Sequence, residues 1–199
     1  MLDRTIPFFN TILRCDSYTH QDVILPEGYK ILPYQEGFEN AWAELEFAIQ
    51  DFDSVEEARQ YFVETYLQDR DQLDKILFAV APDGAVVGTC IAWQDLRQGT
   101  WFSSLHWLVV DEKHQGLGLG RALCHAVLNI YEAQGNLPVY IHTQPWSWKA
   151  IFLYLSLGFK LQKHDSFSHY VNQHEQAMAA LKNVVTPEQY ALLCESSEE

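Results

Sequence analysis

The chain has 199 residues, of which 48% are hydrophobic and 14% aromatic, and this is enough for one well-buried domain. Its formal net charge is -14 at pH 7, and residues 1–100 carry 18 acidic but only 7 basic side chains. So acidic a chain is a poor ligand for nucleic acid or for an anionic membrane surface, and we expect neither as a partner. A cationic substrate, such as an amine, suits this charge better.

The four cysteines form neither a Cys-x-x-Cys pair nor a metal-binding spacing, and the histidines show no such spacing either. We therefore expect no metal. No signal peptide opens the sequence, and no apolar run approaches the ~18 residues that a membrane span needs. Together these features predict a reduced, cytoplasmic protein.

The first 27 residues are the hardest to place. The apolar residues between Ile6 and Leu13 predict a short amphipathic segment that packs on the domain; membrane association is the alternative, but the segment has few bases. We expect 1–27 to be an N-terminal extension, 28–163 to be one domain that holds the functional site, and 164–199 to be a C-terminal helical extension.

Hydrophobic spacing and turn residues predict the elements of the first half. Ser54 and Glu57 form a capping box that opens a helix, and Pro82-Asp83-Gly84 marks a hairpin. The predicted elements are strand 29–33, helix 37–52, a helix opening at Ser54, and strands 76–81, 85–93 and 102–110.

In the second half, glycines end helices and a capping sequence opens one. Gly135 and Gly158 are typical of helix C-termini, and Thr186-Pro187-Glu188-Gln189 is typical of a helix start. The predicted elements are a helix ending near Gln134, strand 138–144, helix 147–157, a strand from 159, helix 173–184, a helix from 187 and a frayed tail at 196–199.

Between the strand at 102–110 and the next helix, glycine occupies every second position. The sequence reads Gln115-Gly116-Leu117-Gly118-Leu119-Gly120-Arg121. Glycine lets backbone amides approach a ligand closely, and the N-terminus of the following helix attracts an anion, so a phosphate group is the expected occupant. A Rossmann turn would need a third glycine at Arg121 or Leu123, and a P-loop would need Gly-Lys followed by Ser or Thr. The sequence has neither.

The [Gln/Arg]-x-x-Gly-x-[Gly/Ala] pattern from Gln115 to Gly120 resembles the acyl-CoA pyrophosphate loop of the GNAT superfamily of N-acetyltransferases. A second segment, Ala150 to Phe159, resembles the Ala-x-x-Leu-Tyr-x-x-x-Gly-Phe segment of the same family. The resemblance covers about residues 29–161. It implies an α/β fold with a GNAT-like mixed, mostly antiparallel twisted sheet, flanked by helices on both faces and followed here by a C-terminal helical extension.

The resemblance also implies acetyl-CoA as co-substrate and assigns residues to it. The backbone of the strand would pair with the pantetheine arm, and a main-chain amide, that of Leu108, would polarise the thioester oxygen. In the family this strand carries a bulge. Tyr154 would donate a proton to the leaving thiolate, because a phenol has a suitable pKa of about 10. The predicted acetyl-CoA-binding residues are Leu108, Val109, Val110, Gln115, Gly116, Leu117, Gly118, Leu119, Gly120 and Arg121.

The general base is open at this stage. Some family members carry a glutamate on the strand before the loop, near Ser104 here, but no glutamate lies between Thr100 and Asp111. His106 on the same strand and His142 on the neighbouring strand are the candidates, since an unperturbed imidazole pKa of about 6.5 suits a base at neutral pH. Three acidic residues in or just after the first helix could act instead through water: Glu44, Glu46 and Asp51.

Two functions are compatible with the sequence. The first is an acetyltransferase that moves the acetyl group of acetyl-CoA to a primary amine of a small molecule or peptide, by direct attack in a ternary complex. The second is a non-catalytic acyl-CoA-binding sensor or regulatory module, which the missing carboxylate near Ser104 favours. The acceptor is expected to be cationic, and a homodimer through the C-terminal segment is left open.

Overall fold

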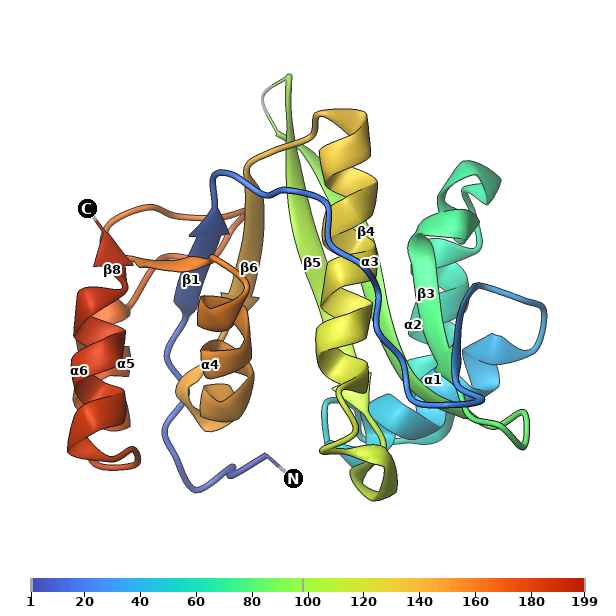
Figure 1. The fold of residues 1–199 in the computed structure, drawn as a ribbon, viewed down its shortest axis with the longest axis horizontal. Coiled ribbons are helices and arrows are strands. Elements are labelled where there is room, and N and C mark those ends of the chain that lie inside the picture. The colour runs from blue at the N-terminus through green and yellow to red at the C-terminus, as the bar shows by residue number, and fades with distance from the viewer. Residues whose placement is uncertain (1, 98, 199) are drawn as a thin grey trace. The chain divides into compact units, whose positions relative to one another are not determined.

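The computed structural model describes residues 2–97 and 99–198, and its mixed α/β fold confirms the predicted fold class (Figure 1). Eight strands are hydrogen-bonded in the order β2-β3-β4-β5-β6-β1-β7-β8. β1 pairs antiparallel with β6 and β7, and β3 pairs antiparallel with β2 and β4, whereas β5 pairs in parallel with β6 and β7 with β8. The strands are β1 (Thr11–Cys15), β2 (Lys30–Pro33), β3 (Ile76–Val80), β4 (Val86–Arg97), β5 (Thr100–Val110), β6 (Val139–Thr143), β7 (Lys160–Gln162) and β8 (Ser197–Glu198).

The chain divides into two compact units, which are described separately. Unit 1 comprises Thr19–Trp93 and Leu105–Gln134, and unit 2 comprises Leu2–Tyr18, Gln94–Ser104 and the chain from Gly135 onward. The helices of unit 1 are α1 (Phe38–Ala48), α2 (Val55–Tyr66) and α3 (Leu119–Gln134), and those of unit 2 are α4 (Trp148–Ser156), α5 (His174–Leu181) and α6 (Pro187–Glu195).

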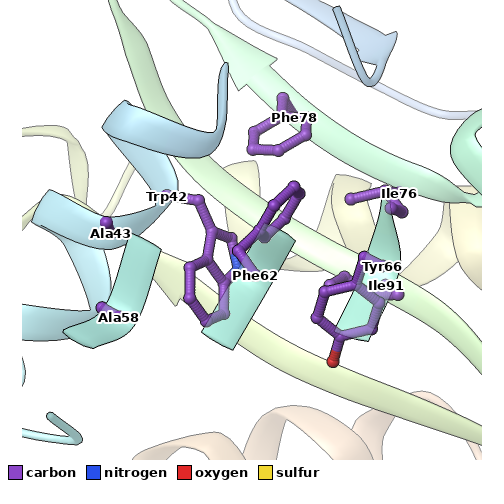
Figure 2. Packing of buried hydrophobic residues seen from close by; sticks show 8 residues of the cluster. All are labelled: Trp42, Ala43, Ala58, Phe62, Tyr66, Ile76, Phe78 and Ile91. Carbon is purple, nitrogen blue, oxygen red and sulfur yellow. The ribbon is translucent and has the colours of Figure 1, made fainter. Parts of the chain in front are cut away.

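In unit 1, α1 and α2 pack their apolar faces on β3 and β4. Figure 2 shows this core, in which the rings of Trp42 and Phe62 lie side by side with their centroids 5.1 Å apart. Each such ring contributes roughly 1.5–3 kcal/mol when fully buried. The cap predicted for α2 is present: the Ser54 hydroxyl accepts a hydrogen bond from the Glu57 amide at 3.1 Å. The Glu57 carboxylate accepts one from the amide of Asp53 rather than that of Ser54.

α3 has the boundaries that its apolar stripe predicts, and it lies along the strands of unit 1 (Figure 1). Its side chains Cys124 and Tyr131 are fully buried. The Tyr131 hydroxyl donates to the Trp93 carbonyl of β4 at 2.7 Å, so the buried phenol is satisfied and ties the helix to the strand. The thiol of Cys124 lies against that of Cys90 on β4, and both cysteines are free.

In unit 2, the N-terminal segment differs from its prediction. Residues Thr11–Cys15 are not part of an amphipathic segment packed on the domain; they form β1, between β6 and β7 in the sheet. Its pairing runs from Thr11 opposite Thr143 to Cys15 opposite Val139. Because β1 has neighbours on both edges and is buried on both faces, its apolar residues do not alternate with polar ones, and the local pattern does not reveal a strand.

The C-terminal segment also differs in one place. The capping box of α6 is present as predicted, with the Thr186 hydroxyl accepting from the Gln189 amide at 3.2 Å. Residues Ser197 and Glu198, expected to fray, instead pair in parallel with β7 as β8. Two residues carry too little pattern to predict a strand. Glu199 lies outside the described residues. In the described part of the chain, no helix has the length and apolar character needed to cross a bilayer.

Candidate active site

The glycine loop of unit 1 is open and has the backbone that its sequence predicts. Gly116 and Gly118 have φ values of 78° and 84°, in the left-handed region that favours glycine. A Cβ atom built on either residue would meet nothing within 4 Å. The chain from Gln115 to Gly118 is exposed. The loop therefore offers its backbone to a ligand.

Polar contacts fix both ends of this loop. The amide of Asp111 donates to the Val87 carbonyl of β4 at 2.8 Å, and its carboxylate accepts from the Lys113 amide at 2.8 Å. Asp111 thus caps a short 3₁₀ turn. The Gln115 side chain donates to the Val110 carbonyl at 3.0 Å, and His114 hydrogen-bonds the Tyr29 hydroxyl at 2.9 Å.

The N-terminus of α3 adjoins the glycine loop. Leu119 is buried and anchors the first turn, while the Ala122 amide donates to the Gly118 carbonyl at 3.0 Å. By helix geometry the amides of Leu119 and Gly120 precede the first intrahelical donor, so they have no acceptor within the helix. Amides and helix dipole together favour an anion. Arg121 is exposed in the same turn.

One turn further along α3 lies His125, which the sequence did not single out. Its burial, and secondarily the charge of Arg121, lower the pKa of this imidazole. Arg121 and His125 are four residues apart and therefore share one face of the helix. The basic face beside the glycine loop thus consists of a permanent cation and an imidazole that favours its neutral form.

The strand before the loop contains one residue with an unusual backbone. Trp107 of β5 has a φ of 51°, which is uncommon for any residue except glycine. Its indole N–H donates to the Tyr66 hydroxyl at 2.7 Å, and its ring lies 5.4 Å from that of Trp42. Figure 2 shows the Tyr66 hydroxyl pointing away from the rest of the labelled core. This break in the extended backbone directly precedes Leu108, where the family resemblance implies a bulge.

The three other residues of β5 that were predicted to bind acetyl-CoA are Leu108, Val109 and Val110. Their side chains are partly or fully buried, and their backbone leads into the glycine loop. Val109 is buried, and Leu108 and Val110 are half-buried. A Cβ on Gly88 of β4 would lie 3.0 Å from the Val109 carbonyl oxygen, so any other residue would have to shift this backbone by a few tenths of an ångström. The binding roles of these three residues stay predictions.

The predicted catalytic residues are divided between the units. His106, in unit 1, is half-buried and stacks on Trp93 with ring centroids 6.2 Å apart. His142, in unit 2, hydrogen-bonds Asn10 at 2.9 Å and stacks on Tyr170 at 3.5 Å. Tyr154, also in unit 2, is only 5% exposed on α4. Their roles as base or acid stay predictions.

A further acidic group of unit 1 is Glu46 on α1, which is 0% exposed. Burial first, and the nearby charge of Asp51 second, raise the pKa of its carboxyl well above the ordinary value. The sequence identified Glu46 only as one of three acidic residues near the first helix. Its position four residues after Trp42 on the apolar stripe was the signal that it would be buried.

The comparison with protein families decides the assignment. The sequence model described as the acetyltransferase (GNAT) family matches residues 37–159, more than half of the chain. The chain belongs to the GNAT family. The chemistry of this family is acyl transfer from acetyl-CoA, and the loop described above lies inside the matched range. No protein with curated annotation matches the chain.

Solved structures show the same fold. A GCN5-related N-acetyltransferase from Sphaerobacter thermophilus is 21% identical, with a TM-score of 0.56 over 77% of this chain and 48% of its own. Glucosamine-6-phosphate N-acetyltransferase from Arabidopsis thaliana is 20% identical, with a TM-score of 0.55 over 72% and 99%. A GNAT acetyltransferase from Colwellia psychrerythraea is 12% identical, with a TM-score of 0.60 over 78% and 54%. This GNAT chain thus spans about half the length of the Sphaerobacter protein.

Proposed function

We propose that this GNAT protein transfers the acetyl group of acetyl-CoA to a primary amine of a small molecule or peptide, by direct attack in a ternary complex. The observation that carries the proposal is the open glycine loop at the N-terminus of α3, inside the range that matches the family. Acetyl-CoA would supply the activated acyl carbon, and the chain supplies positioning and proton transfer.

The acetyl-CoA side of the site is assigned to unit 1. The backbone amides from Gln115 to Arg121 bind the pyrophosphate, because the loop is open at Gly116 and Gly118 and leads directly into a helix N-terminus. The backbone of Leu108–Val110 pairs with the pantetheine arm, and the amide of Leu108 polarises the thioester carbonyl. The left-handed backbone of Trp107 supports this assignment, since it interrupts the regular strand just before that amide.

The proton-transfer roles follow from the family resemblance. Tyr154, which is almost fully buried on α4, donates a proton to the leaving thiolate. His106 and His142 are the bases that the sequence proposed. Both rings stack on an aromatic neighbour, and His142 also hydrogen-bonds Asn10, so both histidines stay candidates.

The acceptor is proposed to be a cationic amine, because the first half of the chain is strongly acidic. The protein is proposed to act in the cytoplasm. An amino sugar phosphate is one candidate to screen, since a neighbour of the same fold is a glucosamine-6-phosphate N-acetyltransferase. We propose neither nucleic acid nor membrane as a partner. Self-association through the C-terminal segment is a further proposal.

A second candidate function is an acyl-CoA sensor without turnover. One specific observation favours it: β5 carries no acidic side chain between Thr100 and Asp111, where some family members hold their base. The two candidates share acetyl-CoA binding and differ only in chemistry.

The first experiment is a thermal-shift titration with acetyl-CoA, with CoA, NAD and ATP as controls. A ligand at 100 times its dissociation constant adds roughly 2.7 kcal/mol to stability, which is a readily measured shift. The second is thiol release from acetyl-CoA with a panel of amines. Stabilisation with turnover supports the enzyme, and stabilisation without turnover on any amine supports the sensor. If acetyl-CoA does not bind, both candidates are wrong.

A further inference from the structure

Helix α1 carries two fully buried polar side chains with unsatisfied atoms. Trp42 and Glu46 lie four residues apart, so both project from the same face of the helix. Among the described residues, none hydrogen-bonds the Trp42 indole nitrogen or either Glu46 carboxyl oxygen. Native proteins satisfy nearly all buried polar atoms, so a donor and two acceptor atoms left open on one helix face indicate a missing polar partner.

Aromatic rings surround this face. The Trp42 ring lies 5.7 Å from Phe52, 6.2 Å from Tyr61, 6.4 Å from Tyr66 and 5.4 Å from Trp107. These rings come from α1, from the turn after it, from α2 and from β5. A carboxyl group beside several aromatic faces is the chemistry that recognises an ammonium group on an apolar stem.

The charges around Glu46 favour a cation as well. The charge of Asp51, in the turn after α1, raises the pKa of the Glu46 carboxyl further. On α2, Tyr66 feels the charge of Glu46 and interacts with the hydroxyl of Tyr61. On β5, the neighbouring Trp107 donates to that same Tyr66 hydroxyl and does not titrate. The groups known to face the carboxyl are thus acidic or neutral, and a bound ammonium would be its counter-charge.

We propose that Glu46 binds the amine of the acceptor and accepts its proton, and that the substrate is a primary amine carried on an apolar stem. This inference rests on the proposed acetyltransferase function and names its base and its acceptor class. It assigns to α1 the role that His106 and His142 were predicted to fill.

The proton balance closes in four steps. Binding of the ammonium displaces the proton of the buried Glu46 carboxyl to solvent, and the ammonium N–H bond then breaks as an O–H bond forms on Glu46, which leaves a neutral amine with a lone pair. As the C–N bond forms and the C–S bond breaks, Tyr154, in its predicted role, gives its proton to the thiolate. The second proton leaves the nitrogen to solvent, and Tyr154 regains a proton from solvent, so that both side chains end in their starting state and one proton is released per acetyl group transferred. No oxidant, reductant or metal is needed.

Access to the carboxyl requires one ring to move. Tyr61 is 37% exposed and stacks on the fully buried Trp42, so it is the outermost ring of this cluster. Displacement of Tyr61 by the stem of the acceptor would uncover the Trp42 ring, one turn from Glu46 on the same helix face, and leave an aromatic contact in its place.

The kinetic test uses Glu46→Gln, with 2-phenylethylamine as acceptor and Glu64→Gln as the matched control on an exposed site of α2. We expect kcat/KM for the amine at pH 7 to fall at least about 100-fold in Glu46→Gln and to be unchanged in the control. Acetyl-CoA binding should be unchanged in both. In Glu46→Gln, log kcat/KM should rise with unit slope up to the pKa of the amine, because only the neutral amine reacts without a base.

A spectroscopic test does not depend on turnover. The ¹³C carboxyl resonance of Glu46, assigned by its absence in Glu46→Gln, is followed while 2-phenylethylamine is added to the wild-type protein. We expect a shift toward the carboxylate position with the amine and none with 2-phenylethanol, which has the same stem without the charge.

The outcomes separate the two proposals. Wild-type turnover that Glu46→Gln retains in full would overturn the role of Glu46 and leave the acetyltransferase function standing. Failure of the wild-type protein to bind acetyl-CoA would overturn the function, while the carboxyl resonance still reports on the amine site. A Glu46 resonance that responds to neither ligand, or equally to both, would overturn the amine site even if Glu46→Gln does not fold.

Discussion

In unit 1, both strand β5 and the glycine loop that follows it contain residues with a left-handed backbone, and this conformation is accommodated differently in the two regions. Trp107 adopts a φ of 51° inside β5, where aromatic rings and a hydrogen bond to Tyr66 hold it. Gly118 adopts a φ of 84° in the following loop, where nothing lies within 4 Å of the position of a Cβ. At Trp107 packing compensates for strain, and at Gly118 the missing side chain avoids it.

The difference shows what each place can do. The loop has open space at the Cβ positions of Gly116 and Gly118, so a ligand can approach its backbone closely. The cluster around Trp107 is closed, and its contacts fix where the amide of Leu108 lies at the end of β5. A rigid strand and an open loop joined directly to one another are suited to placing the two ends of one long ligand.

The largest effect on stability should come from removing the side chain of Trp107, whose ring packing holds its own strained backbone. Trp107→Ala is expected to lower the free energy of unfolding by about 3 kcal/mol, near the lower end for such truncations because the ring is half-buried. Urea denaturation measures this. Trp101→Ala on the same strand, where the side chain is 62% exposed, should change stability by less than about 0.5 kcal/mol. Equal losses in both variants would show that packing does not stabilise the backbone at Trp107.

The next effect concerns the buried carboxyl beside this cluster. Burial raises the pKa of Glu46 in the folded state, so the stability it contributes is full below the unfolded pKa of about 4.5 and is lost as the pH rises through the folded pKa. Glu46→Gln removes this loss. The variant should therefore gain stability relative to wild type as the pH rises above 4.5, by up to about 1.4 kcal/mol per pH unit.

Chemical denaturation of both proteins at a series of pH values from 5 to 8 measures this difference. Glu64→Gln is the control, since its carboxyl is exposed and should give a curve parallel to wild type. A constant offset between Glu46→Gln and wild type would mean that the carboxyl ionises as readily when folded as when unfolded, and the cluster would not be closed.

A third variant tests whether the open glycine binds ligand or only turns the chain. Gly118→Ala and Gly135→Ala place alanine at positive φ on the two sides of α3, and at both sites the added Cβ meets nothing. Each should lose about 1 kcal/mol of stability. Only Gly118→Ala should also lose affinity for acetyl-CoA, roughly tenfold or about 1.4 kcal/mol, by calorimetric titration. Equal affinities in the two variants would remove the glycine loop from the binding site.

The elements that could be predicted from the sequence have local causes, and those that were missed have non-local causes. The glycine loop and α3 are specified by adjacent residues, so their boundaries could be predicted within a few positions. β1 and β8 exist because distant strands pair with them, and five and two residues carry no pattern that reports this. The strand over Thr11–Cys15 was therefore mistaken for a packed amphipathic segment.

The candidate site shows the same limit. Gln115 to Arg121 could be predicted as a binding loop from glycine spacing, a helix start and the family resemblance, because all three are read from adjacent residues. The left-handed backbone of Trp107 was not predicted, since it depends on rings from α1 and α2 that meet only in the fold. For the same reason the sequence ranked Glu46 below the histidines: a glutamate on a helix is usually solvated, and only packing shows that this one is buried.

The smallest effect would separate the two forces that hold Trp107. Tyr66→Phe removes the acceptor of its indole N–H, and Trp107→Phe removes the donor but keeps a ring in place. Each single variant is expected to lose about 1 kcal/mol of stability, and the double variant less than the sum, with a coupling energy of about 1 kcal/mol. Denaturant unfolding of the four proteins measures the cycle. A coupling energy near zero would mean that ring packing alone holds the left-handed residue, and the position of the Leu108 amide would then depend on the aromatic cluster and not on the hydrogen bond to Tyr66.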